Sequence, residues 1–373
     1  MSKRNRDEDT VIVSGVNSTA HFNDSVQLDH QRHQTQANDL KKVVLFAGDN
    51  GTSHAVLNTL IPELLDAGIE PVVFLTSGSN SPKSQIQEIK DFSFFESGIL
   101  EAVYDYLEHS YPLTTKDSDP RDNIFYSPNQ LADLYDVTIT KINTVNDPEL
   151  IAAINADPSV IGSVSVKNYQ LFSEPAIEAL KTDDKFLWNI HTGELPLYRG
   201  VFVPVRVMQD NAAEYGWTMH DIDAGIDTGA IIDLRTRGMK PEETALDAYY
   251  NMSEKGAIMI ADNVKLAAKG MPRPHIPQDE SKARYFSFPT SEEIEALENM
   301  TSPHLLYDEH ETVERYLKMF SDEEQHSDHA SGLGLVIRDA IINYHNGKTL
   351  TVNPQFYVPA PEKQSGLDNG PVA

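Results

Sequence analysis

The sequence predicts an α/β fold built on an open, Rossmann-like and mostly parallel sheet. Residues 41–76 have the pattern of a strand, a glycine loop, a helix, a glycine stop and a second strand, which is a βαβ unit. Further strand patterns alternate with helical patterns up to residue 235. Since βαβ units build parallel sheets, this alternation favours the α/β class.

The first 40 residues lack the pattern of a packed element. They are rich in Asp, Gln, Asn, His and Ser, and their apolar residues are too scattered to bury a face. We interpret residues 1–40 as a flexible N-terminal arm. Three histidines of this arm fit no helical metal pair and are assigned no metal: His21, His30 and His33.

Residues 41–76 are the first predicted unit of the main domain. Apolar residues recur there at helical spacing, at Val56, Leu57, Leu60, Ile61, Leu64 and Leu65. Further strands are expected at 137–142, 160–166, 186–190, 217–221 and 230–235. Helices are expected near 84–108, 147–155 and 174–181.

A long packing helix is expected to close this domain. Thr244 and Asp247 resemble a capping box, Pro241 precedes the start, and Gly270 supplies the stop. After Pro277 the pattern changes to a strand or loop followed by helices with charged stretches between them. We therefore predict a main domain at 41–275 and an acidic C-terminal appendage at 276–373.

Composition restricts the location and the chemistry. No apolar run approaches the roughly 18 to 20 residues that cross a bilayer, and the charged start resembles no secretory signal. We expect a cytoplasmic protein without a membrane partner. The absence of cysteine excludes disulfides, thiolate nucleophiles and thiolate metal sites, which leaves oxygen and nitrogen chemistry.

The net charge argues against a nucleic acid partner. Acidic residues outnumber basic ones by 57 to 30, which gives a formal charge of −27, and no basic run is longer than two lysines. A field of this sign repels polyphosphate, so a small-molecule substrate is expected. The acidity itself fits a solvated surface. The oligomeric state is left open, and a homodimer is compatible with the sequence.

For two further motifs, a structural interpretation is favoured over a binding site. The stretch AGDNGTSH at 47–54 lies between a strand and a helix, where helix amides could hold an anion. It lacks both the GxGxxG spacing and the lysine of a phosphate loop, so a tight turn is favoured and a ligand-covering loop is the alternative. His326 and His329 lie in an acidic segment and are interpreted as part of a solvated loop, with a shared metal as the alternative.

Asn189, His191 and Asp227 form the strongest chemical pattern. Asn189 and His191 are two places apart at a strand end, so both side chains should leave on one face, and Asp227 follows in a loop between two later strands. An amide stabilises an oxygen that becomes negative, a histidine exchanges a proton near neutral pH, and a carboxylate orients that histidine. The set predicts acyl transfer without a covalent enzyme intermediate. Taken singly, His191 and Asn189 fit a structural histidine and a turn cap.

The stretches NIHTGELPLYRG and GWTMHDIDAGIDTGAII resemble the formyltransferase family that uses 10-formyltetrahydrofolate. The family pattern of Asn, His, a leucine-proline turn, YRG and then DxGxDTG is met here by Asn189, His191, Leu195, Pro196, Tyr198, Arg199, Gly200, Asp223, Gly225, Asp227, Thr228 and Gly229. The similarity covers roughly residues 41–275 and is weakest at the beginning.

The resemblance implies a role for each matching residue. Asn189 would bind the formyl oxygen, His191 would support the oxyanion and move a proton, and Asp227 would orient the histidine. No metal is implied. The pterin of 10-formyltetrahydrofolate would lie against two segments, which gives as cofactor-binding residues Tyr169, Gln170, Leu171, Asp223, Ala224, Gly225 and Ile226. For Tyr169, Gln170 and Leu171, the alternative interpretation is the buried end of a strand.

Two features bear on the identity of the formyl acceptor: residues that differ from the family pattern, and the lack of a basic domain. Where the resemblance implies Pro, Ser and Leu after the histidine, this chain has Thr192, Gly193 and Glu194. The resemblance also implies a basic domain in members that formylate methionyl-tRNA, whereas this appendage is acidic. Small amines remain, including an amino sugar nucleotide, for which the binding candidates are Tyr198, Arg199, Arg206 and Tyr285.

Two other functions stay open beside formyl transfer. Hydrolysis of 10-formyltetrahydrofolate needs the same three residues, with water in place of the amine. A noncatalytic folate-binding protein would have no need of all three together. The sequence therefore favours an N-formyltransferase for a small amine.

Overall fold

The structure is a computed structural model that describes residues 40–77, 86–110, 125–300, 305–321 and 327–347. The chain divides into two compact units, Met1–Leu40 and Lys41–Ala373, and the description below concerns the second. The expectations for His21, His30, His33 and His326 fall outside the described residues, as does the side chain of His329.

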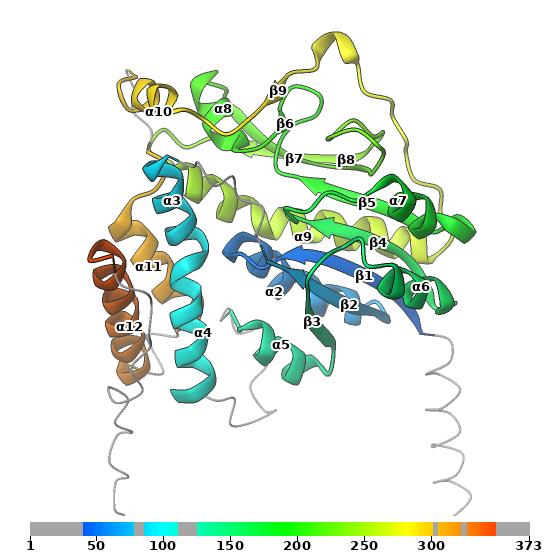
Figure 1. The fold of residues 1–373 in the computed structure, drawn as a ribbon, viewed down its shortest axis with the longest axis horizontal. Helices are drawn as coiled ribbons and strands as arrows, with labels where there is room; N and C mark the ends of the chain where they lie inside the picture. The colour runs from blue at the N-terminus through cyan, green and yellow to red at the C-terminus, as the bar shows by residue number, and fades with distance from the viewer. Residues whose placement is uncertain (1–39, 78–85, 111–124, 301–304, 322–326, 348–373) are drawn as a thin grey trace, which may run out of the picture. The chain divides into compact units, whose positions relative to one another are not determined.

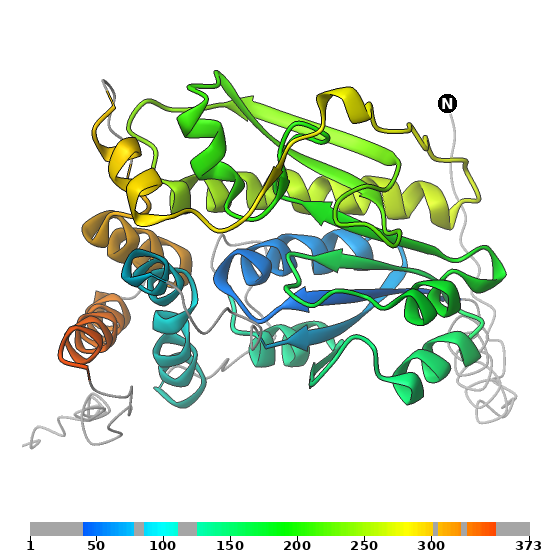
Figure 2. The same cartoon turned by 45° about the horizontal axis from the view of Figure 1, so that its top comes forward.

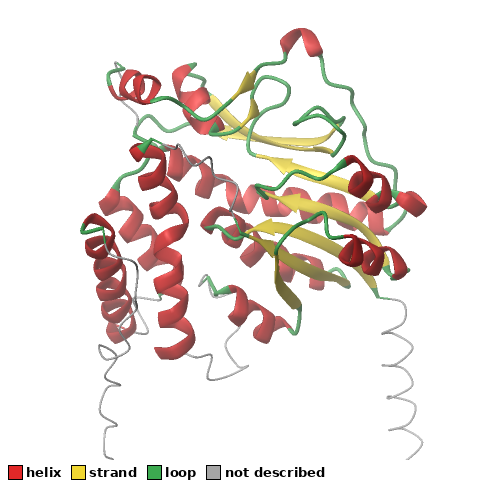
Figure 3. Cartoon of the chain, viewed as in Figure 1, coloured by secondary structure: helices red, strands yellow, loops and turns green. Residues whose placement is uncertain are grey.

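A seven-stranded sheet forms the centre of the unit (Figure 1, Figure 3). Its order is β3-β2-β1-β4-β5-β7-β8. The strands are β1 (Lys41–Gly48), β2 (Ile69–Thr76), β3 (Thr138–Ile142), β4 (Val160–Val166), β5 (Phe186–His191), β7 (Glu214–Asp221) and β8 (Ile231–Gly238). The first five pair in parallel, and β7 is antiparallel to both β5 and β8. The predicted α/β class with a mostly parallel sheet is confirmed.

Helices cover both faces of the sheet. In β1, Val43 and Leu45 belong to one core cluster and Val44 and Phe46 to the other, as the alternation along a strand requires. The first cluster is covered by α2 (Gly51–Leu65), α5 (Pro128–Tyr135), α8 (Val203–Gln209) and α9 (Ala245–Ala268). The second lies under α6 (Pro148–Ala156) and α7 (Glu174–Leu180) (Figure 2).

Helix α9 begins and ends where the local sequence predicts. The Thr244 hydroxyl accepts a hydrogen bond from the Asp247 amide at 3.0 Å, and the Asp247 carboxylate accepts one from the Thr244 amide at 2.9 Å. This is a complete capping box. Gly270 follows the helix with a φ of 69°, a conformation that favours glycine.

The helices after residue 276 share the main core. They are α10 (Ser291–Glu298), α11 (Glu309–Phe320) and α12 (Ser327–His345), and α12 packs on α4 (Ile99–Ser110). Their buried side chains Leu297, Tyr316 and Ile337 belong to the same cluster as β1. The division into 1–40, 41–275 and 276–373 stays a prediction.

Several elements differ from the expectation or were not expected. The helix expected near 84–108 consists of α3 (Gln87–Ser93), a π-helical turn η1 (Phe94–Gly98) and α4. A two-stranded pairing of β6 (Arg199–Gly200) with β9 (Tyr285–Phe286) was not predicted, because two residues carry no periodicity. None of the helices in the described ranges is both long and apolar enough to cross a membrane.

Candidate active site

Strand β5 presents Asn189 and His191 at its end, beside β4 and β7. Asn189 is paired with Ser165 on one side and with His220 on the other. Asn189 is half-buried and His191 is buried. The positions of both side chains are therefore fixed by a central strand rather than by a loop.

Asp227 reaches the same place from the loop between β7 and β8. Its Oδ1 lies 3.4 Å from His191 Nδ1 and 3.6 Å from His220 Nε2. Its Oδ2 accepts a hydrogen bond from the Gly200 amide at 2.9 Å. Asp227 has a φ of 55°, which is a strained region for a residue with a side chain. The structure thus brings Asn189, His191 and Asp227 together.

The hydrogen bonds of His191 indicate which ring nitrogen is available. Nε2 lies 2.5 Å from the carbonyl oxygen of Tyr198, and a carbonyl can only accept, so Nε2 carries the hydrogen. Nδ1 faces the Asp227 carboxylate. When the ring is neutral, Nδ1 is therefore the atom that can take up a proton.

Burial and charge set the protonation states of this pair. Burial lowers the pKa of His191, and the negative charge of Asp227 opposes only part of that shift. Burial alone would raise the pKa of Asp227, but His191, His220 and the Gly200 amide outweigh it and leave the pKa well below its usual range. At neutral pH the site combines an uncharged imidazole with an ionised carboxylate.

His220 is a site residue that the sequence analysis did not single out. Its Nδ1 donates to the Asp221 carbonyl oxygen at 2.8 Å, which leaves Nε2 to accept from the Asn189 amide nitrogen at 3.1 Å. One of the two hydrogens of that amide is thereby engaged. The antiparallel register that pairs Asn189 with His220 was the missing signal.

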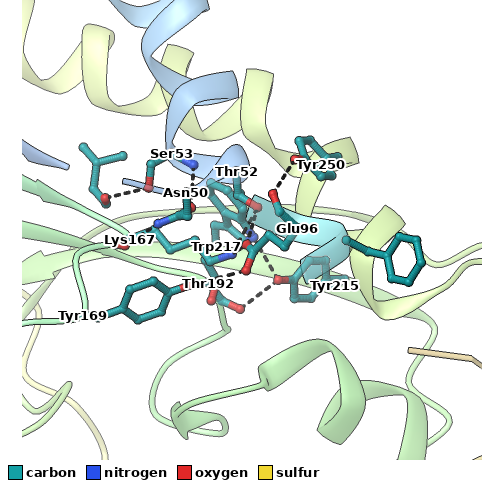
Figure 4. Close-up of polar contacts among 12 residues, drawn as sticks. Asn50, Thr52, Ser53, Glu96, Lys167, Tyr169, Thr192, Tyr215, Trp217 and Tyr250 are labelled. Carbon is teal, nitrogen blue, oxygen red and sulfur yellow. Dashed lines mark hydrogen bonds and ion pairs between the residues drawn. The ribbon is translucent and has the colours of Figure 1, made fainter. Parts of the chain in front are cut away.

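The proposed cofactor residues lie on two segments. Tyr169 and Leu171 are 44% and 67% exposed, whereas Gln170 is buried and accepts from the Val145 amide at 3.0 Å. Gln170 also donates to the Asn143 carbonyl at 3.0 Å. Leu171 is thus exposed toward solvent, whereas Tyr169 is only partly exposed because its hydroxyl donates to the buried Glu96 carboxylate at 3.4 Å (Figure 4).

The second segment is the exposed turn Asp223, Ala224, Gly225 and Ile226. Asp223 Oδ1 accepts from the Gly225 amide at 3.1 Å and from the Thr228 hydroxyl at 2.6 Å, which closes the turn. Ile226 is 42% exposed. The cofactor roles of all seven residues stay a prediction.

The glycine stretch after β1 forms the expected tight turn. Asn50 caps α2 by accepting from the Ser53 amide at 3.0 Å. A Cβ on Gly48 would lie 2.4 Å from the Lys167 carbonyl oxygen, so the close approach of two chain segments requires glycine there. The structure supports the turn interpretation.

A buried ion pair closes the start of α2 (Figure 4). The Glu96 carboxylate accepts from the Thr52 hydroxyl at 2.9 Å and from Lys167 Nζ, which also lies 3.8 Å from the centre of the Tyr249 ring. Burial lowers the pKa of Lys167, and Glu96 opposes that shift. An internal carboxylate therefore lies beside the first turn of α2, where negative charge interacts favourably with the helix dipole.

The four residues suggested for a nucleotide sugar have other environments. Arg199 and Arg206 are buried and pair with Glu280 at 2.6 Å and Glu293 at 2.7 Å. The Tyr198 hydroxyl donates to Asp210 at 2.8 Å. Tyr285 alone of the four is exposed. Structural roles for the two arginines and Tyr198 are favoured.

Relatives of known name provide an independent comparison. No protein-family model matches the chain. A stretch of 139 residues is 32% identical to a methionyl-tRNA formyltransferase from Synechococcus sp. (strain JA-3-3Ab), covering 37% of this chain and 42% of that protein. A second such enzyme, from Chlorobium chlorochromatii (strain CaD3), is 27% identical over 158 residues, or 41% and 47% of the two chains.

These matches confirm the resemblance to the formyltransferase family. The chain spans less than half the length of these two relatives. Among solved structures, a sugar 3N-formyl transferase in the presence of dTDP and 5-N-formyl-THF is similar, with a TM-score of 0.43, 23% identity and coverage of 66% and 69%. A phosphoribosylglycinamide formyltransferase from Anaplasma phagocytophilum has a TM-score of 0.41, 16% identity and coverage of 62% and 88%.

Proposed function

We propose that this chain is an N-formyltransferase that moves the formyl group of 10-formyltetrahydrofolate to the amine of a small metabolite. The observation that carries the proposal is that three side chains meet at one place. Asp227 lies within ion-pair range of His191 and of His220. Asn189 donates a hydrogen bond to the same His220. The formyltransferase relatives support the reaction class.

Each residue has a definite task in this reaction. The Asn189 amide has a free N–H that stabilises negative charge on the formyl oxygen as the amine attacks the formyl carbon. His191 Nδ1 accepts the proton that the attacking amine loses, directly or through a water molecule. The imidazolium then supplies a proton to N10 of the folate as the bond from the formyl carbon to N10 breaks and tetrahydrofolate leaves. The ionised Asp227 stabilises the imidazolium that results and holds the ring in place.

The described residues offer a surface that fits a folate ring. Three large apolar side chains, Tyr169, Leu171 and Ile226, are exposed on the two predicted segments. A pterin is flat and apolar on its faces, so exposed apolar side chains suit it, and Ile226 directly precedes Asp227 in the chain. Among the described residues no group of three or more His, Cys, Asp or Glu is arranged to hold a metal ion.

The acceptor belongs to the proposal as a small amine, with an amino sugar nucleotide as one option. Methionyl-tRNA is a second candidate because two relatives bear that name. The formal charge of −27 argues against it, since RNA binding gains most of its affinity from basic residues. Cytoplasmic location, absence of a nucleic acid partner and a homodimeric state stay predictions.

The test is to incubate the protein with 10-formyltetrahydrofolate and pools of amines, and to search by mass spectrometry for products heavier by one formyl unit. Methionyl-tRNA forms a separate pool. Asp227→Asn is the matched control, because it keeps the size of the side chain and removes the charge. We expect it to lose roughly 100-fold or more in turnover, because proton transfer to His191 loses the charge that stabilises the imidazolium, with folate affinity nearly unchanged.

Four outcomes distinguish the alternatives. A formylated small amine establishes the proposal, and formylated methionyl-tRNA replaces the acceptor. Release of formate that no amine diverts indicates a hydrolase. Folate binding without any product, in the wild type and in Asp227→Asn alike, indicates a binding protein and contradicts the proposal.

A further inference from the structure

A C-terminal segment, residues 276–286, fastens two loops that carry the site; we call it the strap. Its Ile276 forms an antiparallel bridge with Ile231, directly after the Asp227 loop. Its other end pairs as β9 with β6, so that Phe286 faces Gly200. The strap therefore connects the loop that holds Asp227 to the turn whose Gly200 amide binds Asp227.

Gln278 is the strap residue in direct contact with the Asp227 loop. Its Nε2 donates to the carbonyl oxygens of Asp227 at 2.8 Å and of Gly229 at 2.7 Å. Its Oε1 accepts from Arg199 Nε at 3.1 Å and Nη2 at 2.8 Å. Carbonyls only accept and a guanidinium only donates, so the Gln278 amide has one possible orientation. In that orientation both of its N–H groups donate and its oxygen accepts.

These bonds act on a strained piece of backbone. Asp227 has a φ of 55°, a conformation that a residue with a Cβ seldom adopts unless its surroundings hold it there. The Gln278 amide binds the carbonyl of that same residue, and Arg199 is held in turn by Glu280 at 2.6 Å. Without the amide, the loop can relax toward ordinary φ values and carry the carboxylate away from His191.

We propose that Gln278 is a positioning residue that holds Asp227 in its left-handed conformation, so that the Asp227 carboxylate faces His191. Gln278 touches neither His191 nor Asn189 in the described structure and acts through Asp227. The expected effect of Gln278 on turnover rests on the proposed function, whereas its expected effect on the conformation of the Asp227 loop does not.

The chain contains a matched control for Gln278. Gln209 has the same chemistry at another place: its Oε1 accepts from Arg206 at 2.9 Å, and its Nε2 donates to the Glu293 carbonyl at 3.2 Å. It joins α8 to α10. Gln278→Ala and Gln209→Ala therefore remove bonds of the same kind, four at the Asp227 loop and two elsewhere.

The first experiment measures turnover. We expect Gln278→Ala to lower kcat by up to about 100-fold, the effect of an ångström-scale displacement, with the KM for folate changed less. Gln278→Glu keeps the size but directs a carboxylate at two carbonyls, and it should lose activity similarly. Gln209→Ala should keep wild-type kcat. In an Asp227→Asn background, Gln278→Ala should have little further effect, because the two residues act as one unit.

The second experiment needs no activity. The titration of the His191 ring is followed by nitrogen-15 NMR in the ligand-free protein, where the ionisable groups facing the ring are Asp227 and His220. Displacement of the Asp227 charge in Gln278→Ala should move the His191 midpoint to lower pH, and Gln209→Ala should leave it in place. Gln278→Glu adds a carboxylate of its own, which favours the protonated ring, so its midpoint should fall less than that of Gln278→Ala.

The outcomes separate this inference from the proposed function. If no acceptor is ever formylated but the His191 midpoint moves in the Gln278 variants alone, the function is wrong and the positioning role holds. An unchanged midpoint in both Gln278 variants, or full additivity with Asp227→Asn, overturns the positioning role even in an active enzyme. Equal losses of activity and Tm in the Gln278 and Gln209 variants also overturn it, because they indicate a general structural role.

Discussion

The Asn189 amide nitrogen donates to His220 Nε2 at 3.1 Å, across two antiparallel strands that pair these residues directly. One hydrogen of a two-hydrogen donor is thus fixed by the protein, and the direction of the other follows from the planar amide. The same relationship explains why neither residue is free to turn toward another partner.

Asn189→Ala should slow turnover by about 100- to 1,000-fold, the range observed when one oxyanion donor is removed. The reason is that the amide interacts most strongly with an oxygen that has become negative. Single-turnover kinetics at saturating folate measures the effect. Folate affinity should change by far less than the rate, and an equal change in both would contradict a role confined to the transition state.

His220→Phe should lower kcat by about 10-fold through misorientation of the Asn189 amide. Phenylalanine fills the volume of the ring but offers no acceptor for the amide. His275→Gln is the control, since His275 lies nearby, with its Nδ1 at 2.6 Å from Asp221, and has no contact with Asn189. If His220→Phe retains wild-type kcat, the amide does not depend on His220 for its orientation.

The pH profile of kcat/KM should have an acid limb with a midpoint below 6.5. Burial lowers the pKa of His191, and the neutral ring is the active form, so activity rises as pH increases through that lowered value. In Asp227→Asn the residual activity should titrate at still lower pH, because the charge that favours the protonated ring is gone. A midpoint that rises in this variant would exclude His191 as the titrating group.

Lys167→Met should destabilise the protein by about 3 to 5 kcal/mol, because it leaves the buried Glu96 carboxylate without its counter-ion. Lys265→Met is the control: Lys265 pairs with Glu63 at 2.6 Å in a more exposed setting, where loss of an ion pair costs about 1 kcal/mol or less. Urea unfolding measures both. Equal losses in the two variants would show that burial does not govern the Lys167 pair.

Local signals predicted much of the fold. The capping box of Thr244 and Asp247 involves residues three apart, and it fixed the start of α9 to the residue. The parallel strands were recognisable because each is rich in apolar or β-branched residues and bounded by turns. Helix α8 (Val203–Gln209) was not predicted, because its valine-rich segment has the composition of a strand and is buried nearly throughout.

The site was predictable to the extent that its residues are close in sequence or belong to a family motif. Asn189, His191 and Asp227 were named, and the structure places them together. His220 required the register between two strands, and Gln278 required a contact with a carbonyl 51 positions away. A side chain that contacts a distant segment of the chain produces no recurring pattern in the sequence. Such a residue therefore cannot be identified from the sequence alone.

The strap determines how short a working version of this protein can be made. Asn189, His191 and Asp227 all precede residue 275, so a chain cut at that point would retain all three side chains. It would remove the Ile276 bridge, the Gln278 amide and the partner strand of Gly200. Any minimal version for engineering or crystallisation should therefore extend at least through Phe286, or the carboxylate will be present in the chain but out of place.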